Sequence, residues 1–220
     1  MNWSRTLNTA SNVPILAAVG YILVRPGGIA GDLLTSRRER EQERRLVAGS
    51  WDRLLAEASS VSTSGGAVRA VFVEFGDYQC RYCVEQHRLL QRLLAEHPDA
   101  ELWHVHSPLP IHRHAEPAAR AAICAEEQEK FREMHNRLYD TSPEWGEVVD
   151  WAVHAKAAGV PDLEAFRSCL NSEQTSARLD RAKDLARELG ITATPSLVHR
   201  RGVHRGLLTD SAFVALLDPA

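Results

Sequence analysis

The sequence is poor in the features that mark several classes of protein. Aromatic residues make up 6% of the 220 residues, the formal net charge is −3, and no basic stripe interleaves with aromatics, which argues against nucleic-acid binding. There are no internal repeats, which argues against a repeat architecture. No apolar run reaches the roughly 20 residues of a comfortable membrane span. With 44% hydrophobic residues, the composition fits one domain with a sizeable core plus an N-terminal extension.

Cysteine is also scarce: the chain has four, and only Cys80 and Cys83 lie close together. A structural zinc site needs four ligands, usually supplied by two such pairs. Because Cys124 and Cys169 are solitary, the sequence favours a redox dithiol over a zinc site. A zinc site completed by some of the ten histidines and a buried inert pair remain the alternatives. The even count also allows a lasting disulfide in an oxidising compartment.

The segments around the close pair indicate how it would react. Residues 70–75 form a short apolar run bounded by glycines, which predicts a buried strand. Residues 84–97 contain no Gly or Pro and carry leucines at helical spacing, which predicts a helix. A helix N-terminus stabilises a thiolate, the form that attacks disulfides. We therefore expect Cys80 to be the attacking thiol and Cys83, one turn deeper, to resolve the mixed disulfide.

Two charged side chains near the pair are candidate participants. Arg81 places a cation beside the thiolate and would lower its pKa further, unless it is simply a solvated surface residue. Glu74 lies within the apolar run, where a carboxylate is costly without a partner or a role. The alternative for Glu74 is a strand-edge position that faces solvent.

The rest of the chain predicts an α/β domain. Residues 101–106 alternate polar with apolar and predict a second strand, which completes a βαβ unit. Helical patterning dominates residues 116–189. Residues 196–199 and 203–207 predict a hairpin, and residues 211–217 predict a final helix.

A second motif, Gly190-Ile191 with Thr194-Pro195, marks a loop that enters a strand. Together with the strand–CxxC–helix pattern, it resembles the thioredoxin superfamily, in which a cis-proline loop lies beside the redox cysteines. The resemblance narrows to the DsbA-like branch and runs from about Ala67 to Leu217. It is carried by the segments Glu74–Cys80, Pro108–His112 with Ala115, Ala121–Ala125, Glu127–His135 and Phe166–Leu170.

The resemblance implies a thioredoxin fold with a helical insertion, and an enzyme that exchanges disulfides with cysteine-containing polypeptides without a metal or organic cofactor. It implies that Glu74 is a buried proton acceptor with a raised pKa near the resolving cysteine. It implies three substrate-binding residues, Tyr82, Thr194 and Pro195. It also implies a structural disulfide between Cys124 and Cys169, for which two buried free thiols are the alternative. The remaining polar residues of the motif region are expected to serve the turn, the loop or packing: Asp77, Tyr78, His104, His106, His112 and His114.

Partners and direction follow from the same resemblance. An oxidant, the favoured role, would need a reoxidising partner such as a quinone-linked membrane protein, whereas a reductase or isomerase would need an electron donor. Relatives commonly have Pro where this chain has Arg81, and strongly oxidising members have His where it has Tyr82. Residues 199–205 are also markedly basic, so the redox potential and substrate preference are not fixed by the family pattern. The competing hypothesis is a redox-inactive peptide-binding or scaffold protein on the same fold.

The N-terminus indicates the compartment. Residues 1–30 contain a charge-free apolar stretch, Val13–Val24, which favours a signal peptide or membrane anchor and hence a periplasmic or cell-envelope location. A buried helix of a cytosolic protein is the alternative. Residues 31–64 are expected to form a charged helical spacer that ends in the Ser/Gly-rich linker 59–66. Residues 65–220 are expected to form the domain.

Overall fold

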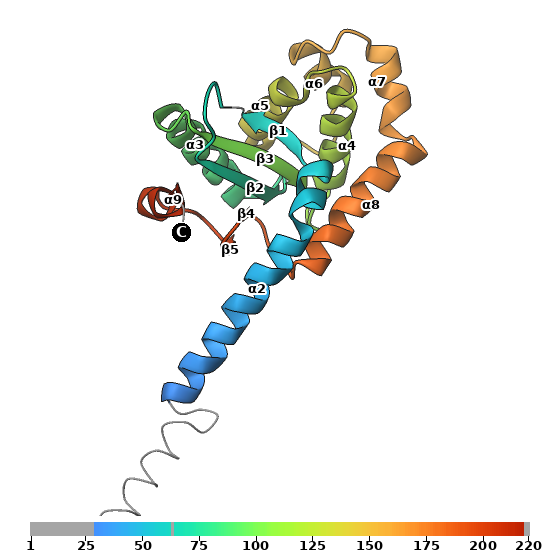
Figure 1. The fold of residues 1–220 in the computed structure, drawn as a ribbon. Helices are drawn as coiled ribbons and strands as arrows, with labels where there is room; N and C mark the ends of the chain where they lie inside the picture. The colour runs from blue at the N-terminus through green and yellow to red at the C-terminus, as the bar shows by residue number, and fades with distance from the viewer. Residues whose placement is uncertain (1–28, 63, 218–220) are drawn as a thin grey trace, which may run out of the picture. The chain divides into compact units, whose positions relative to one another are not determined.

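The computed structural model describes residues 29–62 and 64–217 (Figure 1). The chain divides into two compact units, residues 1–43 and 44–220, and the predicted site lies in the second. The elements are α2 (Ile29–Glu57), β1 (Ser59–Ser62), β2 (Ala70–Gly76), α3 (Arg81–Glu96), β3 (Ala100–His106), α4 (Ala115–Glu126), α5 (Phe131–Thr141), η1 (Ser142–Glu144), α6 (Trp151–Ala157), α7 (Leu163–Leu170), α8 (Glu173–Glu188), β4 (Ser196–His199), β5 (Gly202–Arg205) and α9 (Asp210–Leu217).

A five-stranded sheet, in the order β1-β3-β2-β4-β5, forms the centre of the second unit. Strands β2 and β3 are parallel and joined through α3, which confirms the predicted βαβ unit. The other neighbours pair antiparallel. In this register Glu74 of β2 lies directly between His104 of β3 and Leu197 of β4. The carboxylate is therefore in the middle of the sheet.

The alternation of side chains along each strand separates two cores. One face of the sheet packs against the C-terminal part of α2 and against α8, through residues that include Val47, Trp51, Leu54, Val73, Phe75, Val105, Leu185 and Val198. The opposite face packs against α3, α4, α5, α7 and α9, through residues that include Phe72, Leu90, Leu102, Leu138, Phe166 and Phe213. The result is the predicted thioredoxin fold, with α4 to α8 as the helical insertion (Figure 1).

The segment before the domain differs from the sequence prediction. Residues 59–62, which we assigned to a linker, form β1 and pair with β3. Their sequence, Ser-Ser-Val-Ser, lacks apolar alternation, so their extended conformation comes from pairing with the β3 edge. Trp51 and Leu54 of α2 are buried, although we expected an exposed helix. The limits of the domain itself remain a prediction.

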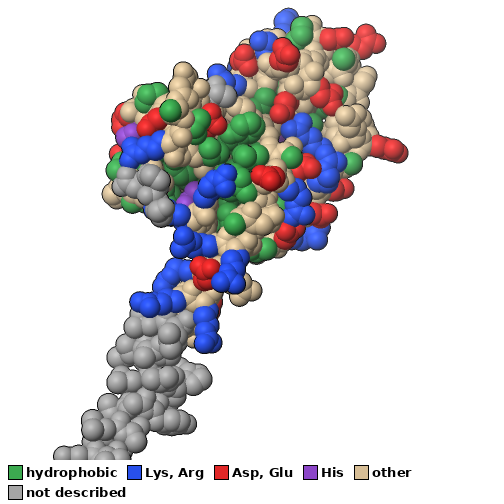
Figure 2. Space-filling model, viewed as in Figure 1, with side chains coloured by type: hydrophobic (Ala, Val, Ile, Leu, Met, Phe, Trp, Pro, Cys, Tyr) green, Lys and Arg blue, Asp and Glu red, His purple; other side chains and the backbone are tan. Residues whose placement is uncertain are grey.

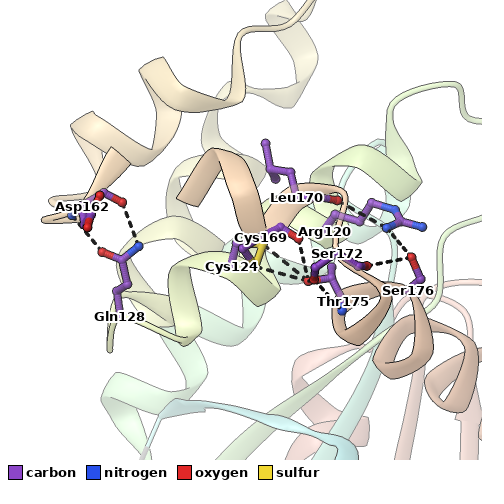
Figure 3. The surroundings of a disulfide bond; sticks show 9 residues. All are labelled: Arg120, Cys124, Gln128, Asp162, Cys169, Leu170, Ser172, Thr175 and Ser176. Atoms are coloured by element: carbon purple, nitrogen blue, oxygen red, sulfur yellow. Dashed lines mark hydrogen bonds between the residues drawn. A yellow bond between two sulfur atoms is a disulfide. The ribbon is translucent and has the colours of Figure 1, made fainter. Parts of the chain in front are cut away.

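The helical insertion is held by a disulfide between Cys124 of α4 and Cys169 of α7 (Figure 3). The hydroxyl of Thr175, at the start of α8, donates to the Cys169 carbonyl at 2.9 Å and lies 3.2 Å from the Cys169 sulfur. Ser172 caps α8 by accepting a hydrogen bond from the Thr175 N–H. The disulfide, the cap and the helix start therefore form one connected cluster.

The surface of the helical block carries charges of both signs, with basic and acidic side chains interspersed (Figure 2). The apolar segment Val13–Val24 lies outside the described residues. Within residues 29–62 and 64–217, no helix has both the length and the apolar character to cross a membrane.

Candidate redox active site

Cys80 and Cys83 lie where β2 passes into α3, as the sequence predicts. Cys80 is the N-cap residue of α3, and its carbonyl accepts hydrogen bonds from the N–H groups of Cys83 at 2.9 Å and Val84 at 3.1 Å. Cys80 is 5% exposed and Cys83 is completely buried. Both are free thiols. Cys80 is thus the one of the two that a large substrate can approach.

The second motif meets the first at Cys80. The Cys80 sulfur lies 3.6 Å from the carbonyl oxygen of Thr194, a residue 114 positions later in the chain. The Thr194–Pro195 peptide bond is cis. The Pro195 carbonyl accepts a hydrogen bond from the N–H of Gly206 at 2.9 Å, which ties this loop to the end of β5. The fold therefore places the proline loop against the more exposed cysteine.

The surroundings of Cys80 stabilise its thiolate. The pKa of Cys80 is lowered from 9.0 to about 5, chiefly because the thiol of Cys83 donates a hydrogen bond to the thiolate. Burial acts in the opposite direction, but the Cys83 thiol and the backbone N–H groups of Cys83 and Tyr82 at the helix start together outweigh it. Cys80 is therefore a thiolate at neutral pH.

The opposite holds for Cys83. Burial raises its pKa above the ordinary value, and the hydrogen bond to Cys80 and the negative charge of Glu74 raise it further. At neutral pH the pair thus consists of one thiolate and one thiol. A buried thiol of this kind needs a proton acceptor before it can attack.

Arg81 and Tyr82 lie at the mouth of the site and contact each other. The Arg81 guanidinium lies 4.5 Å from the centre of the Tyr82 ring, and it donates a hydrogen bond to the Tyr82 hydroxyl at 2.9 Å. Tyr82 is 43% exposed, which suits a residue that contacts a substrate. The effect of Arg81 on the Cys80 pKa stays a prediction, as does substrate binding by Tyr82, Thr194 and Pro195.

Glu74 is buried in the central strand, 1% exposed, which rules out the solvent-facing alternative. Its Oε2 lies 3.7 Å from Nδ1 of His104. Among the residues that the structure describes, neither carboxylate oxygen has a hydrogen-bond partner. Such an oxygen is costly to bury, so Glu74 is a candidate for chemical work.

Asp77 does more than the turn role that the sequence suggested. Its carboxylate accepts hydrogen bonds from the N–H groups of Gln79 and Leu109, each at 2.8 Å, and lies 2.7 Å from Nδ1 of His112. These contacts fasten the loop after β3 to the segment before Cys80. A cleft of about 510 Å³, whose lining includes Leu109, His112, Lys183 and Ile191, adjoins this loop. The one sequence signal for this role was an aspartate placed directly after the predicted strand.

No group of three His, Cys, Asp or Glu within the described ranges is placed to hold a metal ion. The reactive groups that the structure shows at the site are two free thiols and a buried carboxylate.

Comparison with known proteins agrees with this architecture. The family model described as Thioredoxin matches residues 66–219, so the chain belongs to that family. Its fold is that of DsbA-like proteins. The catalytic domain of Proteus mirabilis ScsC superposes with a TM-score of 0.65 at 20% identity, over 79% of this chain and 96% of that one. The thiol-disulfide exchange protein α-DsbA2 from Wolbachia pipientis gives a TM-score of 0.70 at 16% identity, over 82% and 96%.

Curated proteins with similar sequences are named as antiporters, unlike the solved structures above. A Salinispora tropica protein named Na(+)/H(+) antiporter NhaA 3 is 30% identical over 135 residues, which is 61% of this chain and 20% of that protein. A Salinispora arenicola protein named Na(+)/H(+) antiporter NhaA 1 is 29% identical over 67% of this chain and 22% of its own length. The chain thus spans about a fifth of these relatives, and the activity in their names is not transferred to it.

Proposed function

We propose that this chain is an exported thiol:disulfide oxidoreductase that exchanges disulfides with cysteine-containing polypeptides through Cys80 and Cys83. The observation that carries the proposal is the opposite shift of the two cysteine pKa values, lowered to about 5 at Cys80 and raised at Cys83. The Cys80 thiolate attacks a client disulfide and forms a mixed disulfide. Cys83 then attacks the Cys80 sulfur, which releases the client thiol and leaves Cys80 and Cys83 oxidised.

An oxidant role is the favoured direction. A stabilised thiolate stabilises the reduced form of the pair and so makes its disulfide a stronger oxidant. The Cys80 pKa of about 5 lies between the pKa values of about 7 in thioredoxin and about 3.5 in DsbA. We therefore expect a reduction potential between about −270 and −120 mV, the values of those two proteins. Equilibration of the protein with glutathione buffers measures it.

The oxidant role has consequences for location and partners. Disulfide formation belongs to an oxidising compartment, so the proposed location is the periplasm or cell envelope, with residues 1–30 as signal or anchor. An oxidant must also be reoxidised, for which a quinone-linked membrane protein is proposed. Capture of mixed disulfides on a Cys83→Ala variant in cells tests both, because that variant lacks the thiol that releases bound clients.

The direct test of activity is insulin reduction. The wild-type chain should catalyse the reduction of insulin disulfides by dithiothreitol, and Cys80→Ser should abolish it because no thiolate remains to attack. A Cys124→Ser/Cys169→Ser variant removes the other pair of sulfur atoms, leaves Cys80 and Cys83 in place and is the control. If wild type and Cys80→Ser perform alike, the chain is the redox-inactive scaffold instead.

A further inference from the structure

A cluster of buried histidines and tyrosines lies behind Cys83, and the two-cysteine reaction leaves it unused. His87 follows Cys83 by one helical turn on α3, and its ring stacks on Tyr139 of α5 at 4.7 Å between centres. His135 of α5 lies 5.2 Å from His87 and 4.8 Å from His104 of β3. The Tyr78 hydroxyl and Nδ1 of His135 share a hydrogen bond of 3.1 Å. The cluster therefore extends from His87, one helical turn after Cys83, to His104, which lies beside Glu74.

His104 has a special place in this cluster. It is completely buried and lies directly opposite Glu74 in the parallel register, with Nδ1 3.7 Å from the carboxylate. Gly76 makes room for it, because a Cβ at that position would lie 2.6 Å from Cε1 of the His104 ring. Neither ring nitrogen of His104 has a hydrogen-bond partner among the described residues. Within the part of the chain that the structure describes, its ion-pair contact is with the Glu74 carboxylate.

The surrounding groups stay uncharged. Burial lowers the pKa values of His87, His106 and His135 below the ordinary value, so these imidazoles are neutral at pH 7. Burial raises the pKa values of Tyr78 and Tyr139, so both phenols keep their protons. Within the cluster, the pair placed to exchange a proton is therefore Glu74 and His104, whose facing atoms lie 3.7 Å apart.

The groups that face His104 come from every element packed against it. They are Glu74 from β2, Tyr78 from the turn after β2, His106 from β3, Phe131, His135 and Tyr139 from α5, and His87 from α3, on which His104 acts electrostatically. Farther out, Arg178 of α8 acts on Tyr78 and His106, but it is paired with Glu126 of α4. The carboxylates of Glu126 and Asp77 act on Tyr78 and Tyr139, but among the described residues Glu74 is the carboxylate in ion-pair range of His104.

We propose that His104 is a positioning residue for the release step, and that it exchanges a proton with Glu74 so that the carboxylate is free to deprotonate Cys83. The proposal rests on the proposed function, since it concerns the same pair of cysteines. Glu74 acts on the reacting thiol electrostatically, whereas His104 acts through Glu74.

Protons and electrons are conserved in the release step. The Cys83 thiol gives its proton to the Glu74 carboxylate, and the Cys83 thiolate forms a bond to the Cys80 sulfur. The bond between Cys80 and the client sulfur breaks, and the client thiolate leaves with the electron pair. Cys80 and Cys83 are oxidised by two electrons and the client disulfide is reduced. The proton on Glu74 passes to His104 and leaves an imidazolium–carboxylate pair. The 3.7 Å separation must shorten for this transfer, as such contacts commonly do in reacting complexes.

A symmetrical aryl disulfide that releases a coloured thiolate separates the two cysteine steps. When it is mixed with an equimolar amount of the reduced full chain, the first release reports attack by Cys80 and the second reports attack by Cys83. Because proton transfer by a positioned group contributes about 10²–10⁴-fold, we expect His104→Gln to slow the second release at least about tenfold. The first release should keep its rate, and the pH profile of the second should shift.

His106→Gln is the matched control, because it makes the same change on the same strand, in the same cluster and at similar burial. It should leave the second release near the wild-type rate. In a Glu74→Gln background, His104→Gln should cause no further slowing, because its effect passes through Glu74. A purely structural role would instead slow both releases or add to the Glu74→Gln effect.

Nitrogen NMR of the histidine-labelled, reduced protein adds a readout that does not depend on release rates. Glu74→Gln should shift the ring nitrogen signals of His104 more than those of His106, because Nδ1 of His104 lies 3.7 Å from the carboxylate. Equal shifts for the two rings, or equal second-release rates for His104→Gln and His106→Gln, would overturn the inference alone. A wild-type chain that releases no coloured thiolate would overturn the proposed function and the inference with it.

Discussion

The two faces of the central sheet are built from alternate residues of the same strands, yet they differ in chemistry. On one face Val73, Phe75 and Val105 pack with apolar side chains of α2 and α8. On the other, near the carboxyl ends of β2 and β3, the intervening residues Glu74 and His104 face the histidines and tyrosines beneath Cys83. Apolar burial stabilises a fold without directing chemistry, whereas buried polar groups cost stability and can move protons. The comparison indicates that both faces stabilise the sheet by apolar packing, and that only the second also carries polar groups that serve the cysteines.

The largest expected effect comes from removing a buried side chain on the sheet face that packs against α2 and α8. Phe75 is completely buried there, so Phe75→Ala should lower the free energy of unfolding by about 3–5 kcal/mol. Urea denaturation measures this change. The folded fraction should still release both coloured thiolates at wild-type rates, because Phe75 faces away from the polar cluster. A slowed second release with unchanged stability would mean that the division between faces is wrong.

Removing the disulfide should show how far the sheet face that carries Glu74 and His104 depends on the helical insertion. The bond joins residues 45 positions apart, and chain entropy then predicts a loss of up to about 4 kcal/mol for Cys124→Ala/Cys169→Ala. Thermal unfolding in the absence of reductant measures it. Insulin reduction at low temperature should persist, since Cys80 and Cys83 are untouched. An unaltered unfolding temperature would contradict the stabilising role of the bond.

A smaller effect is expected from Gly76→Ala, which crowds the sheet face that carries Glu74 and His104. In Gly76→Ala the new Cβ would lie 2.5 Å from the Tyr139 hydroxyl and 2.6 Å from the His104 ring, so both must move. Overpacking of this kind costs about 1–3 kcal/mol. Denaturation and the second-release rate should both report the displacement. Gly65→Ala, where an added Cβ meets nothing within 4 Å, is the control and should change neither.

The buried histidines should make the fold sensitive to acid. Burial lowers the folded-state pKa of His106, so the unfolded chain takes up a proton first as the pH falls below its ordinary value of about 6.5. The contribution of neutral His106 to stability is complete above that pH and is lost below it. His106→Leu should therefore gain stability relative to wild type as the solution is acidified, in urea midpoints measured against pH. Parallel curves for the two proteins would contradict this account.

The smallest expected effect is at the mouth of the site. Thiolate absorbance of the reduced protein should titrate with a midpoint near the Cys80 pKa of about 5. The thiolate, and the stabilisation of the reduced form that it provides, is thus lost as the pH falls through that value. Arg81→Ala should raise the midpoint only slightly, because Arg81 is exposed and already contacts Tyr82, and Arg81→Glu should raise it more. A midpoint at or above the ordinary cysteine value would remove the case for an activated nucleophile.

Much of the site could be predicted because its signals are local. The apolar run before Cys80 and the helical spacing after Cys83 fix where the cysteines lie in the βαβ unit. A glutamate within that run indicated a buried carboxylate, and Glu74 is one. The contacts among the buried histidines could not be predicted in this way. His87, His104 and His135 come from α3, β3 and α5, and nothing in their spacing indicates that their rings meet.

The sequence by itself determined the fold class and the position of the two cysteines, because hydrophobic period and helix-start chemistry act between near neighbours. The tertiary structure decided that Ser59–Ser62 form a strand and that Trp51 is buried, because pairing and burial there depend on β3 and α8. It also decided that Asp77 fastens the loop after β3 and that His104 lies beside Glu74. These contacts join residues about 30 or more positions apart, and only the packed sheet brings such residues within reach of one another.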